Sequence, residues 1–298
     1  MPRKVLYALF ALILGQAFPA QGQGTRQQPP ENRRLSAERV MKAYAEAYPA
    51  VERAEYRNGD WAVLLKGRWF YWADGRLLSE EKRANTEYAR QSFYYYERDL
   101  GPWEEPDAAA AERLKQILPG RRANPPLRDP DFFDTLWEAR NSNEAYANLV
   151  GVSFLGKRFS VHKALAPKLA AVEARVREAA KSDSSINGWI ASLGSIGAWS
   201  WRNVAATASR SYHSYGVALD IQPARLQGLA TYWQWTSDAG VEWYMTPYER
   251  RWHPPAAVIR AFEAYGFCWG GKWLLFDTMH FEYRPEILIA CGMSVEGL

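Results

Sequence analysis

The sequence predicts an α+β fold, and three observations support this class. Hydrophobic residues make up 48% of the 298 residues and charged residues 23%, as in ordinary globular proteins. Short segments with helical spacing are mixed with short apolar segments that suit strands. These segments do not follow the regular strand–helix alternation of a parallel sheet. The composition excludes a disordered chain, a collagen-like repeat and a coiled coil.

Charge and cysteine content exclude other classes of protein and site. The chain has 37 Lys and Arg against 33 Asp and Glu, a formal net charge of +4. Over this length, that charge is too weak to indicate a nucleic-acid partner. Two cysteines, Cys268 and Cys291, are too few for a disulfide framework or a cysteine-based metal site. The sequence leaves open whether they pair or stay free, because it does not give the distance between them.

Residues 1–22 are predicted to be a secretory signal peptide. Arg3 and Lys4 precede an apolar run over 5–14, and small residues follow it. The run is shorter than the roughly 20 apolar residues of a membrane-spanning helix. An uncleaved N-terminal anchor is the alternative. From the predicted signal peptide we expect export to the periplasm or the extracellular space, and we expect no spanning segment in the rest of the chain.

Residues 23–125 are predicted to form an N-terminal region whose role the sequence leaves open. Ser36 is a suitable N-cap for its first helix. Two strands rich in aromatic residues follow around a turn at Gly67 and form a hairpin. A Pro-rich stretch over 119–130 marks the boundary with the next region. The expected elements are a helix over 37–48, strands over 61–65 and 69–72, and a helix over 106–118.

Residues 126–298 are predicted to form a second domain with more regular patterning. Its longest helix shows apolar residues at helical spacing, at Leu169, Val172 and Val176. Gly266 is expected to end another helix. The expected elements are helices over 131–140, 142–149, 167–180 and 256–265, an extended segment over 155–161, strands over 217–221 and 280–283, and loop with short strand over 188–208.

The first group of residues able to do chemistry surrounds His213. Asp220 follows it by seven residues, at the end of an apolar run. In a strand over 217–221, Asp220 faces away from Val217 and Leu219, because side chains alternate between the two faces. Gly216 permits a tight turn that brings His213 back alongside Asp220.

The second group contains His280, with Asp277 three residues before it and Glu282 two residues after it. Two imidazoles and one carboxylate are a usual catalytic zinc set, which leaves the fourth position for water. Zinc lowers the pKa of that water toward ~7, and a second carboxylate can accept its proton. Histidines with only a structural role are the alternative. Glu282 is expected either to contact a ligand histidine or to face water.

The spacing of these two groups resembles that of a known enzyme family. The matching residues are Ser211-x-His213-x-x-Gly216-x-Ala218-x-Asp220, followed by Asp277-x-x-His280. They are similar to the zinc D-alanyl-D-alanine carboxypeptidase and L-alanyl-D-glutamate endopeptidase family. The resemblance covers roughly residues 149–286. It implies the Hedgehog/DD-peptidase fold, a small antiparallel sheet with flanking helices, and cleavage of peptidoglycan stem peptides.

The resemblance also implies roles for individual residues. His213, Asp220 and His280 would hold Zn²⁺, and Asp277 would be the general base.

An arginine upstream of the first motif binds a substrate carboxylate or polarises the scissile carbonyl in this family. Arg202 is the candidate, and Arg210 is its rival because it lies three residues before His213. Ser211 would help to hold the substrate. The sequence departs from family branches that have a Tyr-Arg pair followed by a Gln.

These observations predict an exported zinc peptidase that acts on peptidoglycan peptides, with its oligomeric state left open. A non-catalytic cell-wall-binding domain with a structural zinc is the first alternative, and a zinc hydrolase of another amide is the second. His162 and His253 are expected to be structural or surface residues. Most tryptophans are expected in the core, and Trp201 and Trp273 are candidates for the wall of a groove.

Overall fold

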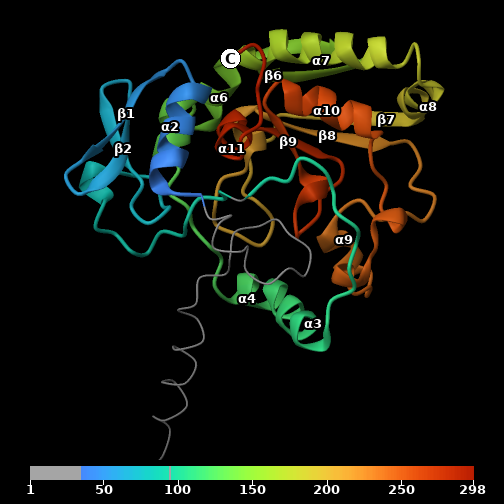
Figure 1. Ribbon diagram of the computed structural model, residues 1–298, viewed down its shortest axis with the longest axis horizontal. Helices are drawn as coiled ribbons and strands as arrows, with labels where there is room; N and C mark the ends of the chain where they lie inside the picture. The colour runs from blue at the N-terminus through green and yellow to red at the C-terminus, as the bar shows by residue number, and fades with distance from the viewer. Residues whose placement is uncertain (1–34, 94) are drawn as a thin grey trace, which may run out of the picture.

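The computed structural model describes residues 35–93 and 95–298. The predicted signal peptide, residues 1–22, lies outside this range. The described residues form helices together with two four-stranded antiparallel sheets and one two-stranded sheet, which is an α+β arrangement, as predicted (Figure 1). Within the described residues, no helix has both the length and the apolar character needed to cross a membrane.

The N-terminal region begins with helix α2 (Ala37–Ala47), and the Ser36 side chain caps it by accepting the Arg39 N–H, as predicted. A four-stranded meander follows, where the sequence indicated only its two central strands. Its strands are β1 (Val51–Arg57), β2 (Asp60–Leu65), β3 (Arg68–Tyr71) and β4 (Leu78–Ser79). The edge strand β1 reads VERAEYR, and only its first residue is buried, so it lacks the apolar alternation that marks a strand in sequence.

The Pro-rich crossover contains more helix than expected. The single helix predicted over 106–118 is two helices, α3 (Ala108–Lys115) and α4 (Ile117–Ala123). Pro119 is accommodated in the first turn of α4, where the backbone N–H groups have no intrahelical partner. The helices predicted over 131–140 and 142–149 are present but end earlier, as α5 (Asp131–Leu136) and α6 (Ser142–Ala147).

The remaining elements build the sheet that carries the candidate site. The extended segment expected over 155–161 is a hairpin of β5 (Leu149–Phe154) and β6 (Lys157–His162). The loop expected from residue 188 is partly helical, because Asp183 caps α8 (Ser184–Ser192) by accepting the Ser185 N–H. The other helices are α7 (Ala166–Ala179), α9 (Trp233–Asp238), α10 (Ala256–Ala264) and α11 (Pro285–Ala290). The central sheet has the order β7 (Leu193–Gly197), β8 (Ala218–Pro223), β10 (His280–Tyr283), β9 (Phe267–Trp269).

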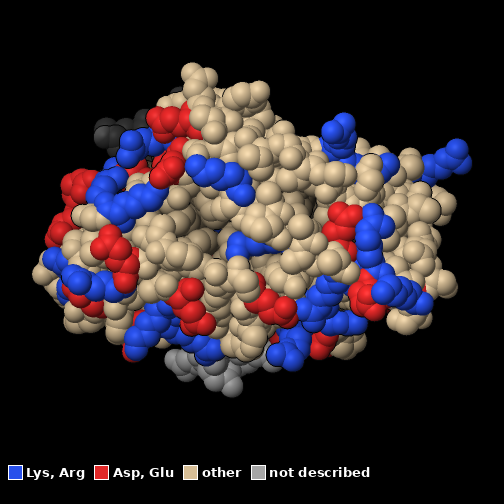
Figure 2. Space-filling model, turned by 90° about the horizontal axis from the view of Figure 1, so that it is seen from above, with Lys and Arg blue, Asp and Glu red and all other residues tan. Residues whose placement is uncertain are grey.

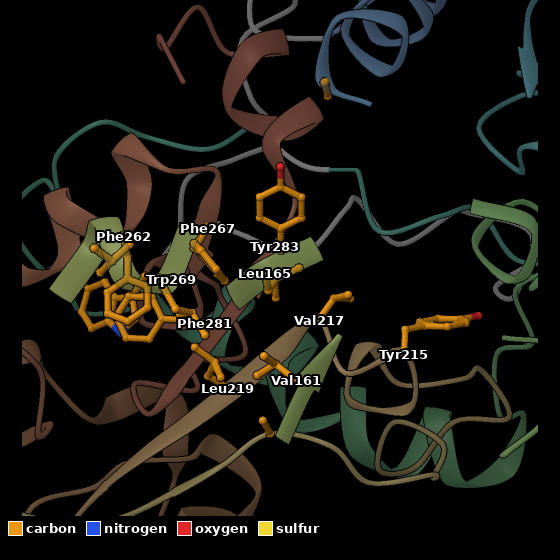
Figure 3. Close-up of a cluster of buried hydrophobic side chains, with 14 of the residues drawn as sticks. Val161, Leu165, Tyr215, Val217, Leu219, Phe262, Phe267, Trp269, Phe281 and Tyr283 are labelled. Atoms are coloured by element: carbon orange, nitrogen blue, oxygen red, sulfur yellow. The ribbon is translucent and has the colours of Figure 1, made fainter. Parts of the chain in front are cut away.

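One face of the central sheet packs on the hydrophobic core (Figure 3). Leu219 from β8 and Phe281 from β10 are completely buried there. The ring of Phe262 from α10 stacks on Phe281 with centroids 4.0 Å apart. The core therefore fixes which face of β8 and β10 is left for polar side chains.

The same core continues into the N-terminal region. The ring of Phe132, from α5, lies 4.9 Å from Tyr44 of α2 and 5.3 Å from Phe70 of β3. Trp137 contacts Tyr48 edge to face. Apolar contacts thus cross the boundary predicted at residues 125–126.

Cys268 and Cys291 form no disulfide in the part of the chain that the structure describes, and the first is buried whereas the second is partly exposed. The Tyr96 N–H donates to the Cys291 Sγ over 3.1 Å. On the face shown in Figure 2, Lys and Arg side chains are interspersed with Asp and Glu.

Candidate metal centre

A short turn places His213. The Ser211 hydroxyl accepts the His213 N–H at 3.3 Å, and Gly216 ends the turn with a positive φ of 70°. A Cβ at Gly216 would lie 2.6 Å from Leu149 Cδ2 and 2.8 Å from the backbone nitrogen of His162. Only glycine suits this position, because both its backbone conformation and the space around it exclude a side chain.

Strand pairing places the other two residues. Asp220 on β8 lies directly opposite His280 on β10, in an antiparallel pair. Because side chains alternate along a strand, both point away from the core face that holds Leu219 and Phe281. The predicted orientation of Asp220 is confirmed.

The three side chains meet at one point. His213 Nε2 lies 3.2 Å from Asp220 Oδ2, and His280 Nδ1 lies 2.9 Å from Asp220 Oδ1. The two imidazole nitrogens are 3.3 Å apart. One ligand atom from each residue lies within 4.8 Å of the others, and the group is mostly buried. Two imidazoles and a carboxylate are the donors that zinc prefers, so the residues present fit this ion.

The outer nitrogen of each imidazole has its own partner. His213 Nδ1 contacts the backbone oxygen of Ala198. His280 Nε2 lies 3.3 Å from Glu282 Oε2. Such partners fix the tautomer and leave the inner nitrogen free to bind a metal. Of the two predictions made for Glu282, contact with a ligand histidine is correct, since its side chain is buried.

The electrostatics of the cluster favour a bound positive charge. Burial lowers the pKa of His280, but Asp220 and Glu282 outweigh this effect and raise it to about 10. Burial raises the pKa of Asp220, but His213 and His280 hold it well below its usual range. Without a metal, the cluster attracts a proton to its imidazoles. A metal ion would bind to the same nitrogens and would therefore compete with that proton.

Asp277 has the properties of a proton acceptor beside this cluster. It is half-buried, and its Oδ1 has no hydrogen-bond partner among the described residues. The Met279 N–H donates to the carboxylate. Burial, followed by the charge of Asp220, raises its pKa to about 7. A carboxylate with such a pKa can both take up and release a proton near neutral pH.

The structure separates the two candidate arginines. The Arg202 side chain is 44% exposed, and its Nη2 lies 3.8 Å from Asp220 Oδ2. Arg210 instead forms an ion pair with Asp134 and stacks over Trp201 at 4.5 Å. The prediction that Arg210 binds substrate is therefore not supported, because its guanidinium is already engaged within the protein.

Ser211, the other predicted substrate-binding residue, is buried. Its hydroxyl caps the turn that holds His213. The structure therefore gives it a positioning role next to a candidate ligand.

The remaining histidines agree with the prediction, whereas the tryptophans agree with it only in part. His162 is buried, and His253 is exposed. The ring of Trp273 lies 5.3 Å from that of His280, whereas Trp201 is half-buried beneath Arg210. The buried tryptophans of the C-terminal half are Trp189, Trp233, Trp243, Trp252 and Trp269, whereas Trp235 is exposed.

Sequence reasoning missed several residues behind the cluster. The Ala198 carbonyl has no signal in sequence, because any residue supplies a backbone oxygen. Arg284 and Glu286 are completely buried charges that continue from Glu282. The alternation of polar and apolar residues in HFEYRPE, residues 280–286, was the available signal.

Comparisons with known proteins cover two segments of the chain. Residues 205–283, which contain the three clustered residues and Asp277, match the D-alanyl-D-alanine carboxypeptidase model of peptidase family M15. Residues 40–95 match DUF8518, a domain of unknown function. No curated protein and no solved structure matches the chain. The segment that carries the candidate metal centre is thus similar to peptidoglycan-related metallopeptidases of family M15.

Proposed function

We propose that this protein is an exported zinc metallopeptidase that hydrolyses peptide bonds in peptidoglycan stem peptides. The proposal covers two types of cleavage, D-Ala-D-Ala carboxypeptidase and L-Ala-D-Glu endopeptidase. It includes a Hedgehog/DD-peptidase fold for residues 126–298 and a signal peptide over residues 1–22. The observation that carries it is the cluster of His213, Asp220 and His280 within the segment similar to M15 peptidases.

His213, Asp220 and His280 would hold the zinc ion. When bound, zinc supplies a Lewis acid and lowers the pKa of a water molecule to about 7. Asp277 would accept the proton of the attacking water at Oδ1 and pass it to the departing amine. Its raised pKa supports this role, as does its Oδ1, for which the described residues supply no hydrogen-bond donor.

Arg202 and Trp273 would contact the substrate. The exposed Arg202 guanidinium next to Asp220 is placed to bind a substrate carboxylate or the developing oxyanion. Trp273, which packs against His280, would form part of the wall of the groove.

A non-catalytic wall-binding domain with a structural zinc is the main alternative. Asp277 argues against it. A carboxylate whose buried oxygen has no hydrogen-bond donor among the described residues destabilises the folded protein, because no hydrogen bond offsets the free energy of its desolvation. A structural site gains nothing from this cost, whereas a hydrolytic site needs a free proton acceptor.

The test compares purified wild-type protein with Asp277→Asn. We expect the variant to keep its zinc, measured by mass spectrometry of the metal, and to lose about 10²–10⁴-fold in the hydrolysis rate of defined stem peptides. Asp238→Asn is the matched control. Asp238 is an exposed residue that pairs with Arg122, so this variant should keep full activity.

The products identify the type of cleavage. Release of free D-alanine indicates a carboxypeptidase. Cleavage between L-alanine and D-glutamate, which separates L-alanine from the rest of the stem peptide, indicates an endopeptidase. Full activity of Asp277→Asn would refute the general base. A zinc-loaded wild-type protein that cleaves no stem peptide would favour the wall-binding alternative.

A further inference from the structure

Strand β10 separates apolar from charged side chains. Phe281 and Tyr283 point into the core (Figure 3). His280 and Glu282 lie on the opposite face, and the chain continues into Arg284 just after the strand. The charged residues therefore follow one another behind the candidate metal centre.

These residues form a continuous buried chain of polar contacts. His280 Nε2 lies 3.3 Å from Glu282 Oε2, and Glu282 Oε1 lies 3.4 Å from Arg284 Nη1. Arg284 Nε donates to Glu286 Oε1. The Tyr48 hydroxyl donates to Glu286 Oε2 at 2.6 Å. All five residues are buried, and Arg284 and Glu286 are completely enclosed.

The far end of this chain lies in the N-terminal region. Tyr48 is the C-cap residue of α2, and α2 lies against α11, which begins directly after Arg284 (Figure 1). Arg284 Nη2 also donates to the backbone oxygen of Ser92 at 3.2 Å. Both Tyr48 and Ser92 lie within residues 40–95, the segment that matches a domain of unknown function.

Buried charges of this kind are stable only while every partner is in place. Arg284 is a guanidinium enclosed between two carboxylates, and those carboxylates need their remaining hydrogen bonds. Without the Tyr48 hydroxyl, Glu286 Oε2 loses its donor and competes more strongly for Arg284. The contact between Arg284 and Glu282, at 3.4 Å, then weakens. Glu282 is held less firmly as a result, and its contact with His280 Nε2 weakens too.

We propose that the segment over residues 40–95 is a positioning element of the metal centre. Tyr48 and Ser92 hold Glu286 and Arg284 in place, and Glu282 then keeps the inner nitrogen of His280 directed at the zinc. This inference rests on the proposed zinc site. If the inference is correct, the N-terminal region is part of the catalytic unit, and Tyr48 is a positioning residue.

The experiment measures zinc binding by the full-length protein carrying Tyr48→Phe. This substitution keeps the ring and its packing and removes only the hydroxyl. We expect the zinc Kd, from competition with a chromophoric chelator, to rise about threefold or more. Glu282→Gln, which changes the direct partner of His280, should raise it about 10- to 100-fold. The visible absorption bands of the Co²⁺-loaded protein should shift in both variants, because the ligand geometry changes.

Tyr96→Phe is the matched control. The Tyr96 hydroxyl also donates to a buried carboxylate, Glu263, at 2.6 Å, but that carboxylate is outside the chain that leads to His280. We expect this variant to lose stability while its zinc Kd and Co²⁺ spectrum stay as in the wild type. Glu286→Gln, which keeps the shape of its side chain, gives a second test of the same chain and should behave like Tyr48→Phe.

The outcomes separate this inference from the proposed function. If the wild type binds zinc and both Tyr48→Phe and Glu286→Gln keep its Kd and spectrum, the positioning role is refuted and the zinc site stands. If Tyr96→Phe shifts the Kd as much as Tyr48→Phe, the effect is general loss of stability and the inference fails. If the wild type binds no zinc, the proposed function fails and this inference falls with it.

Discussion

Gly216 shows how one residue decides the geometry of the candidate site. Its positive φ ends the turn that contains His213, and its lack of a side chain lets β6 approach at His162. The turn and the strand β8 then bring His213 to 3.2 Å from Asp220. A residue that performs no chemistry thus sets the distance between two candidate ligands.

Gly216→Ala is expected to lower both stability and zinc affinity. The left-handed conformation costs an alanine about 1–2 kcal/mol, and contact with backbone atoms 2.8 Å away adds to this loss. Gly228→Ala is the control, since Gly228 also has a positive φ but has open space where a Cβ would be. Urea unfolding and zinc competition measure both effects. Equal losses in the two variants would show that the close approach at Gly216 has no effect.

At the scale of elements, the end of β6 contains a histidine that is buried without its proton. Burial, followed by the charge of Lys163, lowers the pKa of His162 to about 4. Its Nδ1 accepts the Ala164 N–H, and its ring packs against Trp137. Neutral His162 caps the turn that leads into α7, because its Nδ1 can accept a hydrogen bond. Protonated His162 has no acceptor nitrogen and would not cap this turn.

Stability should therefore fall as the pH decreases from about 6.5 to about 4. In this window the unfolded chain binds a proton at His162 that the folded chain does not bind. This difference lowers the free energy of unfolding by up to about 3 kcal/mol. His162→Asn keeps an acceptor for the Ala164 N–H but does not titrate. We expect its free energy of unfolding to depend less steeply on pH, by up to about 1.4 kcal/mol per pH unit.

The exposed His253 gives the control for this prediction, and His253→Asn should follow the wild-type curve. Urea unfolding at a series of pH values measures all three proteins. A His162→Asn curve parallel to that of the wild type would contradict the assignment of this loss to His162.

At the scale of the whole molecule, one core joins the N-terminal region to the sheet of the candidate site. Phe132 contacts Tyr44 and Phe70 on one side and Phe133 on the other. The buried charges from Tyr48 to His280 cross the same interface. The two segments that match different families are therefore packed as one unit.

Phe132→Ala should destabilise both regions together. Loss of this completely buried ring is expected to cost about 3–5 kcal/mol. Hydrogen exchange followed by mass spectrometry measures the result, and the protection of β2 and β8 should fall by similar amounts. Exposed Tyr56 on the outer side of β1 is the control position, and Tyr56→Ala should leave β8 unchanged. Loss of protection in β2 alone would show that the two regions unfold independently.

The sequence predicted those features that depend on neighbours along the chain. The cap at Ser36, the helix α10 and the face of β8 that carries Asp220 follow from patterns a few residues long. The spacing around His213 and His280, together with its resemblance to a known family, indicated the candidate metal cluster, because each motif lies within a short stretch of the chain. The edge strand β1 was missed, because its alternating charges do not mark a buried face.

Only the tertiary structure decided which partners these residues have. Arg210 lies near the motif in sequence, yet its partner Asp134 comes from α5, 76 residues away. Tyr48 and Glu286 are 238 residues apart and share a buried hydrogen bond. Local patterns fix backbone conformation and the direction of a side chain. The pairing of buried charges depends on how distant elements pack, because each charge must find its partner wherever the fold excludes water.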